Sequence, residues 1–321
     1  MPQLNMVDAI NLALKQEMKK DKSVYLFGED IGIDGGVFRV TEGLQKLYKD
    51  RVFDTPLAES GIVGTSFGMA ISGLKPVCEI QFEGFIMPAF DQIVNHVSRI
   101  RNRSRGRFTC PMVIRCPIGG GIKALEHHSD SPEAYFMHTP GIKVVIPSTP
   151  SDAKGLLIAA IRDPDPVIFF EPKRIYRAIK EEVSEKEYII PIGKAKIVQE
   201  GNDVTVISYG ASVRECQQAA ELVKSSIEII DLRTISPLDV DTIITSVKKT
   251  GRVVVVHEAQ KTGGVGAEII ALINEHAILD LQAPVERVTG YDIIVPLAKL
   301  EEHYTVNEQR IAEAITKVVN F

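Results

Sequence analysis

The chain has 321 residues, of which 45% are hydrophobic and 25% charged, and its formal net charge is −5. This length predicts two domains, and the acidic excess excludes the basic surface typical of proteins that bind nucleic acid or anionic membranes. No apolar stretch approaches the roughly 20 residues that span a bilayer, and the opening residues lack the pattern of a signal peptide. The four cysteines form no CxxC pair, which favours reduced thiols over disulfides or a zinc site. We therefore expect a cytoplasmic protein.

Short apolar runs alternate with helical patterns through the first half of the chain. Asn5 and Asp8 form a capping pair in front of a predicted helix, and Thr149 and Pro150 begin another over 150–162. The predicted strands are 23–27, 51–53, 77–82, 112–115, 143–146 and 167–170. This alternation predicts an α/β fold with a mainly parallel sheet over residues 1–180.

A second alternation follows a proline-containing, charged stretch, in which residues 181–192 are the predicted linker. Strands are expected at 204–208, 227–232 and 253–257, and helices at 212–224, 239–249 and 308–319. Residues 193–321 are therefore predicted to form a smaller, doubly wound α/β domain.

Glu59 lies at a predicted turn from strand to helix, where ligands bind in open α/β sheets. A half-buried carboxyl group there can donate or accept a proton. The alternative is an ordinary acidic residue that stabilises the start of a helix. Gly64 and Gly68, one turn apart in the following helix, let another element approach closely. We therefore expect this helix to make a packed contact.

His127 and His128 precede Ser-Pro-Glu, a signal for the start of a helix. The helix dipole would lower the proton affinity of a histidine at this place and suit it to acid–base chemistry. A structural loop histidine is the alternative. The glycines at 119–121 and 263–264 lack the spacing of a phosphate loop, so both are predicted to be flexible loops.

Ordered blocks that run through nearly the whole chain carry a family resemblance. They are GED (28–30), GGVFRVTEGL (35–44), RVFDTPLAESGIVG (51–64), EIQFEGFIMPAFDQIVN (79–95), HSDSPEAYFMHTPGIKVVIPSTPSDAKGLL (128–157), DPDPVIFFEPKRIYR (163–177), IDLRTISPLDVDTI (230–243) and HEAQKTGGVGAEI (257–269). Together they resemble the β subunit of the thiamine diphosphate-dependent decarboxylase component of 2-oxo acid dehydrogenase complexes. The resemblance implies a thiamine-diphosphate-binding fold, with a pyrimidine-binding α/β domain followed by a transketolase-type carboxy-terminal domain.

The resemblance also implies roles for individual residues. Glu59 matches the glutamate that activates the cofactor by holding its pyrimidine ring, and Leu57, Gln81 and Phe85 match cofactor-binding positions. Taken alone, a phenylalanine at that spacing is more often a core residue. His128 matches the histidine that assists acyl transfer to a lipoyl group.

Two further details come from the family. Relatives usually have Gln where this chain has Asp130, and an added carboxylate nearby would raise the pKa of His128. Relatives also hold a structural potassium ion, and the matching positions here are Met112, Ala160, Asp163 and Asp165.

The chain contains no GDG sequence, the motif that holds the magnesium ion and diphosphate in thiamine enzymes. The resemblance therefore implies a separate α subunit that carries magnesium, a heterotetramer of two α and two β chains, and a lipoylated acyltransferase core as partner. The expected reaction is oxidative decarboxylation of a 2-oxo acid, with a branched-chain acid favoured and pyruvate as the second choice. The sequence also leaves open half of a transketolase or deoxyxylulose phosphate synthase, and a doubly wound nucleotide-binding scaffold.

Overall fold

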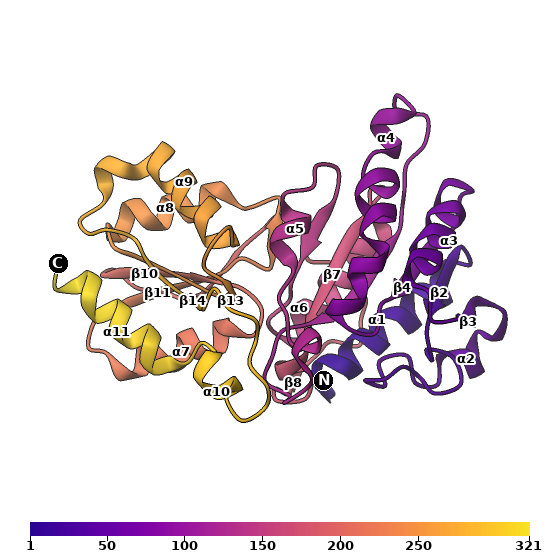
Figure 1. The fold of residues 1–321 in the computed structure, drawn as a ribbon, viewed down its shortest axis with the longest axis horizontal. Helices are drawn as coiled ribbons and strands as arrows, with labels where there is room; N and C mark the ends of the chain where they lie inside the picture. The colour runs from indigo at the N-terminus through magenta and orange to yellow at the C-terminus, as the bar shows by residue number, and fades with distance from the viewer.

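The computed structural model describes residues 1–321, with the side chain of Glu126 outside the description. Two α/β lobes lie side by side, each built on its own sheet (Figure 1). The larger sheet has the order β12-β6-β7-β5-β4-β2-β3, and all its neighbours are parallel except β12 and β6. Its strands are β2 (Val24–Gly28), β3 (Val52–Asp54), β4 (Lys75–Glu79), β5 (Val113–Ile118), β6 (Lys143–Val145), β7 (Val167–Pro172) and β12 (Thr234–Ser236). The α/β fold with a mainly parallel sheet is confirmed.

Helices cover both faces of the larger sheet. On one face lie α1 (Met6–Lys20) and α6 (Pro150–Arg162), and on the other α3 (Glu59–Ile71), η2 (Glu83–Ala89), the π-helix η3 (Gln92–Val97) and α5 (Glu133–Met137). The remaining short elements are α2 (Leu44–Leu47), η1 (Lys49–Arg51), α4 (Ile100–Arg103), η4 (Glu126–His128) and η5 (Lys173–Ile175). The predicted caps are confirmed, since Asn5 accepts from the backbone N–H of Asp8 and Thr149 from that of Asp152.

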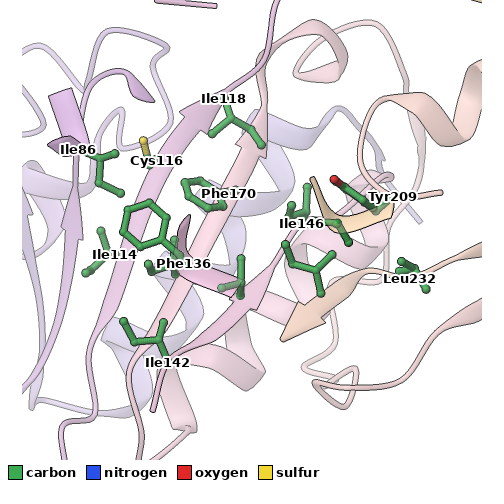
Figure 2. Packing of buried hydrophobic residues seen from close by; sticks show 14 of the residues in the cluster. Ile86, Ile114, Cys116, Ile118, Phe136, Ile142, Ile146, Phe170, Tyr209 and Leu232 are labelled. Carbon is green, nitrogen blue, oxygen red and sulfur yellow. The ribbon is translucent and has the colours of Figure 1, made fainter. Parts of the chain in front are cut away.

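Alternate side chains of the central strands enter different cores, as expected of buried parallel strands. Ile114 and Cys116 of β5 and Phe170 of β7 face the core that also holds Ile86 and Phe136 (Figure 2). Strand neighbours such as Val113 and Phe169 face α1 and α6 instead. The apolar core in Figure 2 continues into the second lobe through Ile146, Tyr209 and Leu232. The two lobes therefore share one packed interior.

The smaller sheet has the order β14-β13-β10-β11-β9, with β9 antiparallel to β11 and the other neighbours parallel. Its strands are β9 (Lys196–Gln199), β10 (Val204–Ser208), β11 (Ile227–Asp231), β13 (Val253–Gln260) and β14 (Glu286–Gly290). Figure 1 shows α8 (Val240–Thr250) and α9 (Val265–Ala277) on one face and α7 (Ser212–Leu222) and α11 (Glu308–Val319) on the other. Short helices η6 (Ile278–Asp280) and α10 (Glu301–Tyr304) complete the lobe. In the described chain, no helix has the length and apolar character needed to cross a membrane.

The two halves of the chain are joined by more than the connecting segment. In that segment β8 (Glu181–Glu182) pairs with β1 (Gln3–Leu4), and Lys154 Nζ donates to the carbonyls of Ser184 and Lys186. Residues 181–186 therefore lie against the first lobe. From the other half, β12 returns and pairs with β6 of the larger sheet. The sequence did not predict this shared strand, nor β9, β14 and α9.

We expect Phe170→Ala to lower the free energy of unfolding by about 3–5 kcal/mol, because Phe170 is fully buried in the apolar core that the two lobes share and its loss leaves a cavity. Urea unfolding of the purified chain followed by circular dichroism measures this. Phe321→Ala is the matched control, since that ring is 78% exposed and its loss should cost less than about 0.5 kcal/mol. Equal losses for the two variants would contradict the packing described here.

Candidate active site

The predicted site residues gather at one edge of the larger sheet. β3, β2, β4 and β5 are parallel neighbours, so their carboxyl ends lie at the same edge. Glu59 follows β3, Glu29 follows β2, Gln81 follows β4, and His128 lies in the segment after β5. Four separate parts of the sequence therefore supply side chains to one region.

A buried arginine ties the central strands together beneath this edge. Arg115 of β5 donates from Nε to Glu171 of β7 at 2.6 Å and from Nη1 to Glu79 of β4 at 2.5 Å. The Tyr176 hydroxyl donates to Glu171 as well, at 2.6 Å. Burial raises the pKa of Glu79, and Arg115 opposes that rise. The carboxylates compensate the buried guanidinium and fix the relative positions of three strand ends.

Glu59 begins α3 and is buried, as the sequence suggested. The carboxyl group of Glu29 lies near enough to interact with it electrostatically. Burial, then Glu59 and Asp30, raise the pKa of Glu29 to about 7. Within the described chain neither oxygen of Glu29 has a hydrogen-bond partner. Glu29 therefore takes up and releases a proton near neutral pH, beside the buried Glu59.

Glu29 was not singled out from the sequence, although an acidic residue directly after a buried strand was a usable signal. Of the other predicted positions, Gln81 donates to Asp30, the residue after Glu29, at 2.9 Å. Leu57 is 76% exposed on the turn before α3 and packs little within the chain. Leu57 is thus an exposed apolar side chain two residues before Glu59.

His128 sits among aromatic rings. Its ring centroid lies 4.3 Å from that of Phe82 and 5.1 Å from that of Phe85, so the structure brings two of the predicted positions, Phe85 and His128, into contact. Burial, then His127 and Lys173, lower the pKa of His128. The rise expected from Asp130 is therefore wrong in direction, because desolvation and two basic neighbours prevail. In the described chain its buried Nδ1 has no hydrogen-bond partner.

A buried ion pair lies next to the aromatic rings that contact His128. Lys173, which follows β7, donates to both oxygens of Glu83, with 2.6 Å to Oε1, and both side chains are fully buried. The Lys173 ammonium also lies 5.6 Å from the centroid of the Phe82 ring that contacts His128. No sequence signal pointed to a buried lysine here.

The predicted potassium positions lie at the opposite edge of the sheet. Met112 and Ala160 are buried, and their carbonyls accept the N–H groups of Val167 and Asp163. Lys143 donates to both oxygens of Asp163, and Arg101 donates to Asp165 at 2.6 Å. Side chains of the chain itself therefore already neutralise these carboxylates. Among the described residues no cluster of three or more His, Cys, Asp or Glu forms a metal site.

The glycines of α3 leave its surface open. A Cβ on Gly64 would lie 3.4 Å from Gln92 Oε1, whereas a Cβ on Gly68 would meet no atom of the described chain within 4 Å. The close contact expected at Gly68 is therefore not made inside the chain.

The arrangement fits an aminopyrimidine ring bound at a carboxyl group. Glu59 and Glu29 supply two buried carboxyl groups, of which Glu29 titrates near neutral pH and has no hydrogen-bond partner for either oxygen in the described chain. The same sheet edge also carries flat ring faces, which come from Phe82, Phe85 and His128. Such a site suits a planar, nitrogen-containing cofactor.

Comparisons with known proteins decide the family. The transketolase pyrimidine-binding domain model matches residues 2–179, and the transketolase C-terminal domain model matches residues 193–311. A pyruvate dehydrogenase E1 component subunit beta from Acholeplasma laidlawii is 58% identical over 98% of both chains. Proteins of the same name from Bacillus subtilis and Staphylococcus aureus strain Mu50 are 53% and 52% identical over all of both chains. The chain belongs to the family of 2-oxo acid dehydrogenase E1 β subunits.

This β subunit also has the fold expected of a thiamine diphosphate-dependent family. A solved structure of a split-gene transketolase, described as an inactive beta4 tetramer, matches 99% of this chain and 99% of its own with a TM-score of 0.82. At 20% identity that likeness shows the fold alone.

We expect Lys173→Met to raise the pKa of His128, because the variant removes a positive charge that opposes protonation of the ring. An NMR titration of the histidine Cε1–H signals measures the shift. Since the variant leaves Glu83 buried without its partner, Lys173→Met/Glu83→Gln is used alongside it to keep the fold stable. Lys123→Met, which removes an exposed lysine five residues before the same histidine, is the control and should leave the His128 pKa in place.

Proposed function

We propose that this β subunit acts in the oxidative decarboxylation of pyruvate, together with an α subunit. The observation that carries the proposal is the meeting of Glu59, Glu29 and the aromatic-lined His128 at one sheet edge. Relatives that are 52–58% identical over nearly the whole chain are named pyruvate dehydrogenase E1 β subunits. Their names favour pyruvate over the branched-chain acid that the sequence analysis preferred.

Thiamine diphosphate, when bound, supplies a carbon nucleophile and an electron sink for loss of carbon dioxide. In this proposal Glu59 binds a nitrogen of its pyrimidine ring and holds or returns the proton there. Glu29 keeps a proton available beside Glu59, since its pKa is about 7. Gln81, Phe85 and Leu57 line the cofactor, and the exposure of Leu57 leaves it free to do so.

His128 is proposed to assist transfer of the acyl group to a lipoyl sulfur. Its lowered pKa keeps the ring mostly neutral at neutral pH and makes the protonated ring a stronger acid, which suits it to give a proton to sulfur. Phe82 and Phe85 fix the plane of the imidazole ring and exclude water from one side of it.

The missing part of the site is proposed to come from the α subunit. The chain has no GDG sequence, so magnesium and the diphosphate are assigned to that partner. The open glycine face of α3 next to Glu59 is a contact surface suited to it. We propose a cytoplasmic heterotetramer of two α and two β chains that delivers its acyl group to the lipoylated acyltransferase core.

We expect the co-expressed α and β chains to decarboxylate pyruvate with a kcat/KM at least about tenfold above those for 3-methyl-2-oxobutanoate and 4-methyl-2-oxopentanoate, because the added carbons of the branched acids must fit the acyl pocket. Assays with an artificial electron acceptor measure the three rates under one condition. A preference for either branched acid would instead favour the prediction of a branched-chain substrate.

We expect Glu59→Gln to reduce decarboxylation by about 100-fold or more, because glutamine cannot hold and return a proton. Size-exclusion chromatography should show the same assembly with the α chain as for the wild type. Glu221→Gln, the same change at an exposed carboxylate of α7, is the control and should retain most activity. Retained activity in Glu59→Gln would refute its role.

We expect His128→Ala to reduce acylation of a lipoyl domain by at least about tenfold more than it reduces decarboxylation. The two rates are measured with the lipoyl domain and with an artificial acceptor. His127→Ala is the matched control, because its ring is exposed next to His128 and has no assigned role. Equal losses in both assays would argue against the assignment of His128.

A further inference from the structure

Two carboxylates of the second lobe accept hydrogen bonds from the backbone of the segment that leads to His128. The segment, here called the histidine loop, comprises residues 119–128 between the end of β5 and His128. Gly120 N–H donates to Oε1 of Glu258 on β13. The N–H groups of Gly121 and Lys123 donate to the two oxygens of Glu301, at 2.6 and 3.0 Å. Both acceptors come from residues more than 130 positions away in the sequence.

The glycine run is shaped for these carboxylates. A Cβ on Gly119 would lie 2.9 Å from Glu258 Oε1, and a Cβ on Gly120 would lie 2.7 Å from Glu301 Oε1. Gly119 and Gly121 have φ values of +82° and +89°, which favour glycine. Successive backbone N–H groups in such a turn form a concave anion site. In this chain the anions are the carboxylates of Glu258 and Glu301. The glycines at 119–121 therefore form a held turn and not the flexible loop predicted from the sequence.

Burial and charge strengthen the contact. Glu301 is only 3% exposed, so its two hydrogen bonds are shielded from water. Arg174 donates to Glu258 Oε2 at 3.4 Å and to Glu215 at 2.7 Å, and it packs against Gly121, where a Cβ would lie 2.5 Å from Arg174 Cδ. The positive charge of Arg174 therefore compensates the carboxylates that gather beneath the loop.

The two ends of the loop are held by contacts within the first lobe. Gly119 N–H donates to the carbonyl of Asp130 at 2.8 Å, and the His128 ring packs on Phe82 and Phe85. Across the described part of the loop, the side chains that accept its backbone N–H groups are Glu258 and Glu301. The second lobe therefore holds residues 120–123, and the first lobe holds the two ends of the loop.

We propose that Glu301 and Glu258 are positioning residues, through which the carboxy-terminal lobe fixes the histidine loop and so sets the place of His128. The effect on catalysis rests on the proposed role of His128, whereas the effect on the loop does not. The lobe that carries no reacting group would thus control acyl transfer and leave decarboxylation at Glu59 largely unaffected.

The first test is hydrogen–deuterium exchange of the α–β complex, read by mass spectrometry in peptides that cover residues 119–128. In Glu301→Ala we expect these amides to exchange about tenfold faster or more, with the rest of the chain unchanged. Glu301→Gln keeps one acceptor oxygen and should lie between Glu301→Ala and the wild type. Glu302→Ala, which removes only an exposed ion pair to the Lys123 side chain of the loop (3.4 Å, with Glu302 81% exposed), is the matched control. Because an exposed pair of this kind contributes little, this variant should exchange like the wild type. Unchanged exchange in Glu301→Ala overturns the proposal.

The second test compares the two half-reactions in the same variants. In Glu301→Ala we expect acylation of a lipoyl domain to fall about tenfold and decarboxylation to stay within about twofold, because misplacement of a group by about 1 Å is enough for such a loss. Glu301→Gln should restore part of the acylation rate, and Glu302→Ala all of it. Faster loop exchange without any loss of acylation overturns the positioning role.

His128→Ala separates this proposal from the proposed function. If His128→Ala keeps full acylation, the assigned role of His128 fails, and the exchange data alone then decide whether the carboxylates hold the loop. If His128→Ala loses acylation and Glu301→Ala does not, the assigned role of His128 stands and the positioning role of Glu301 fails.

Discussion

The buried guanidinium of Arg115 is the interaction on which the site depends. Its bonds to Glu79 and Glu171 link β4, β5 and β7 at the edge where the reactive side chains leave the sheet. A charge buried without partners would be very unfavourable, so the three strands keep the one relative position in which both carboxylates reach it. The segments that carry Gln81, His128 and Lys173 all start from these strand ends. Small shifts between strands would therefore displace the whole site.

Much of the fold was predictable because it rests on local patterns. Capping pairs and helical spacing placed α1, α6 and α11, and runs of β-branched residues placed the central strands. The place of Glu59 at a helix start was predictable for a related reason, whereas the roles of Glu59 and His128 stay predictions. These signals lie within a few residues of the feature that they predict.

The features of the site that were not predicted depend on contacts between residues far apart in the sequence. Burial raises the pKa of Glu29, and Glu59 adds to the rise because β3 lies next to β2. The buried Lys173 has a partner because η2 brings Glu83 to it. The fall in the pKa of His128 arises from desolvation and two basic neighbours, whereas the sequence displayed the carboxylate of Asp130. The glycines at 119–121 looked flexible because their anionic partners lie in the other half of the chain. Each missed feature is a long-range contact.

The strand β12 has a consequence for how the protein is made. Residues 234–236 complete the larger sheet by pairing with β6, although most of that sheet is encoded before residue 173. On the ribosome, the first lobe therefore emerges with the edge of β6 unpaired until much of the second lobe has been synthesised. An open edge of this kind recruits other strands and promotes aggregation. The nascent chain therefore passes through a period in which its amino-terminal lobe needs protection, and a gene cut between the two lobes would make that exposure permanent.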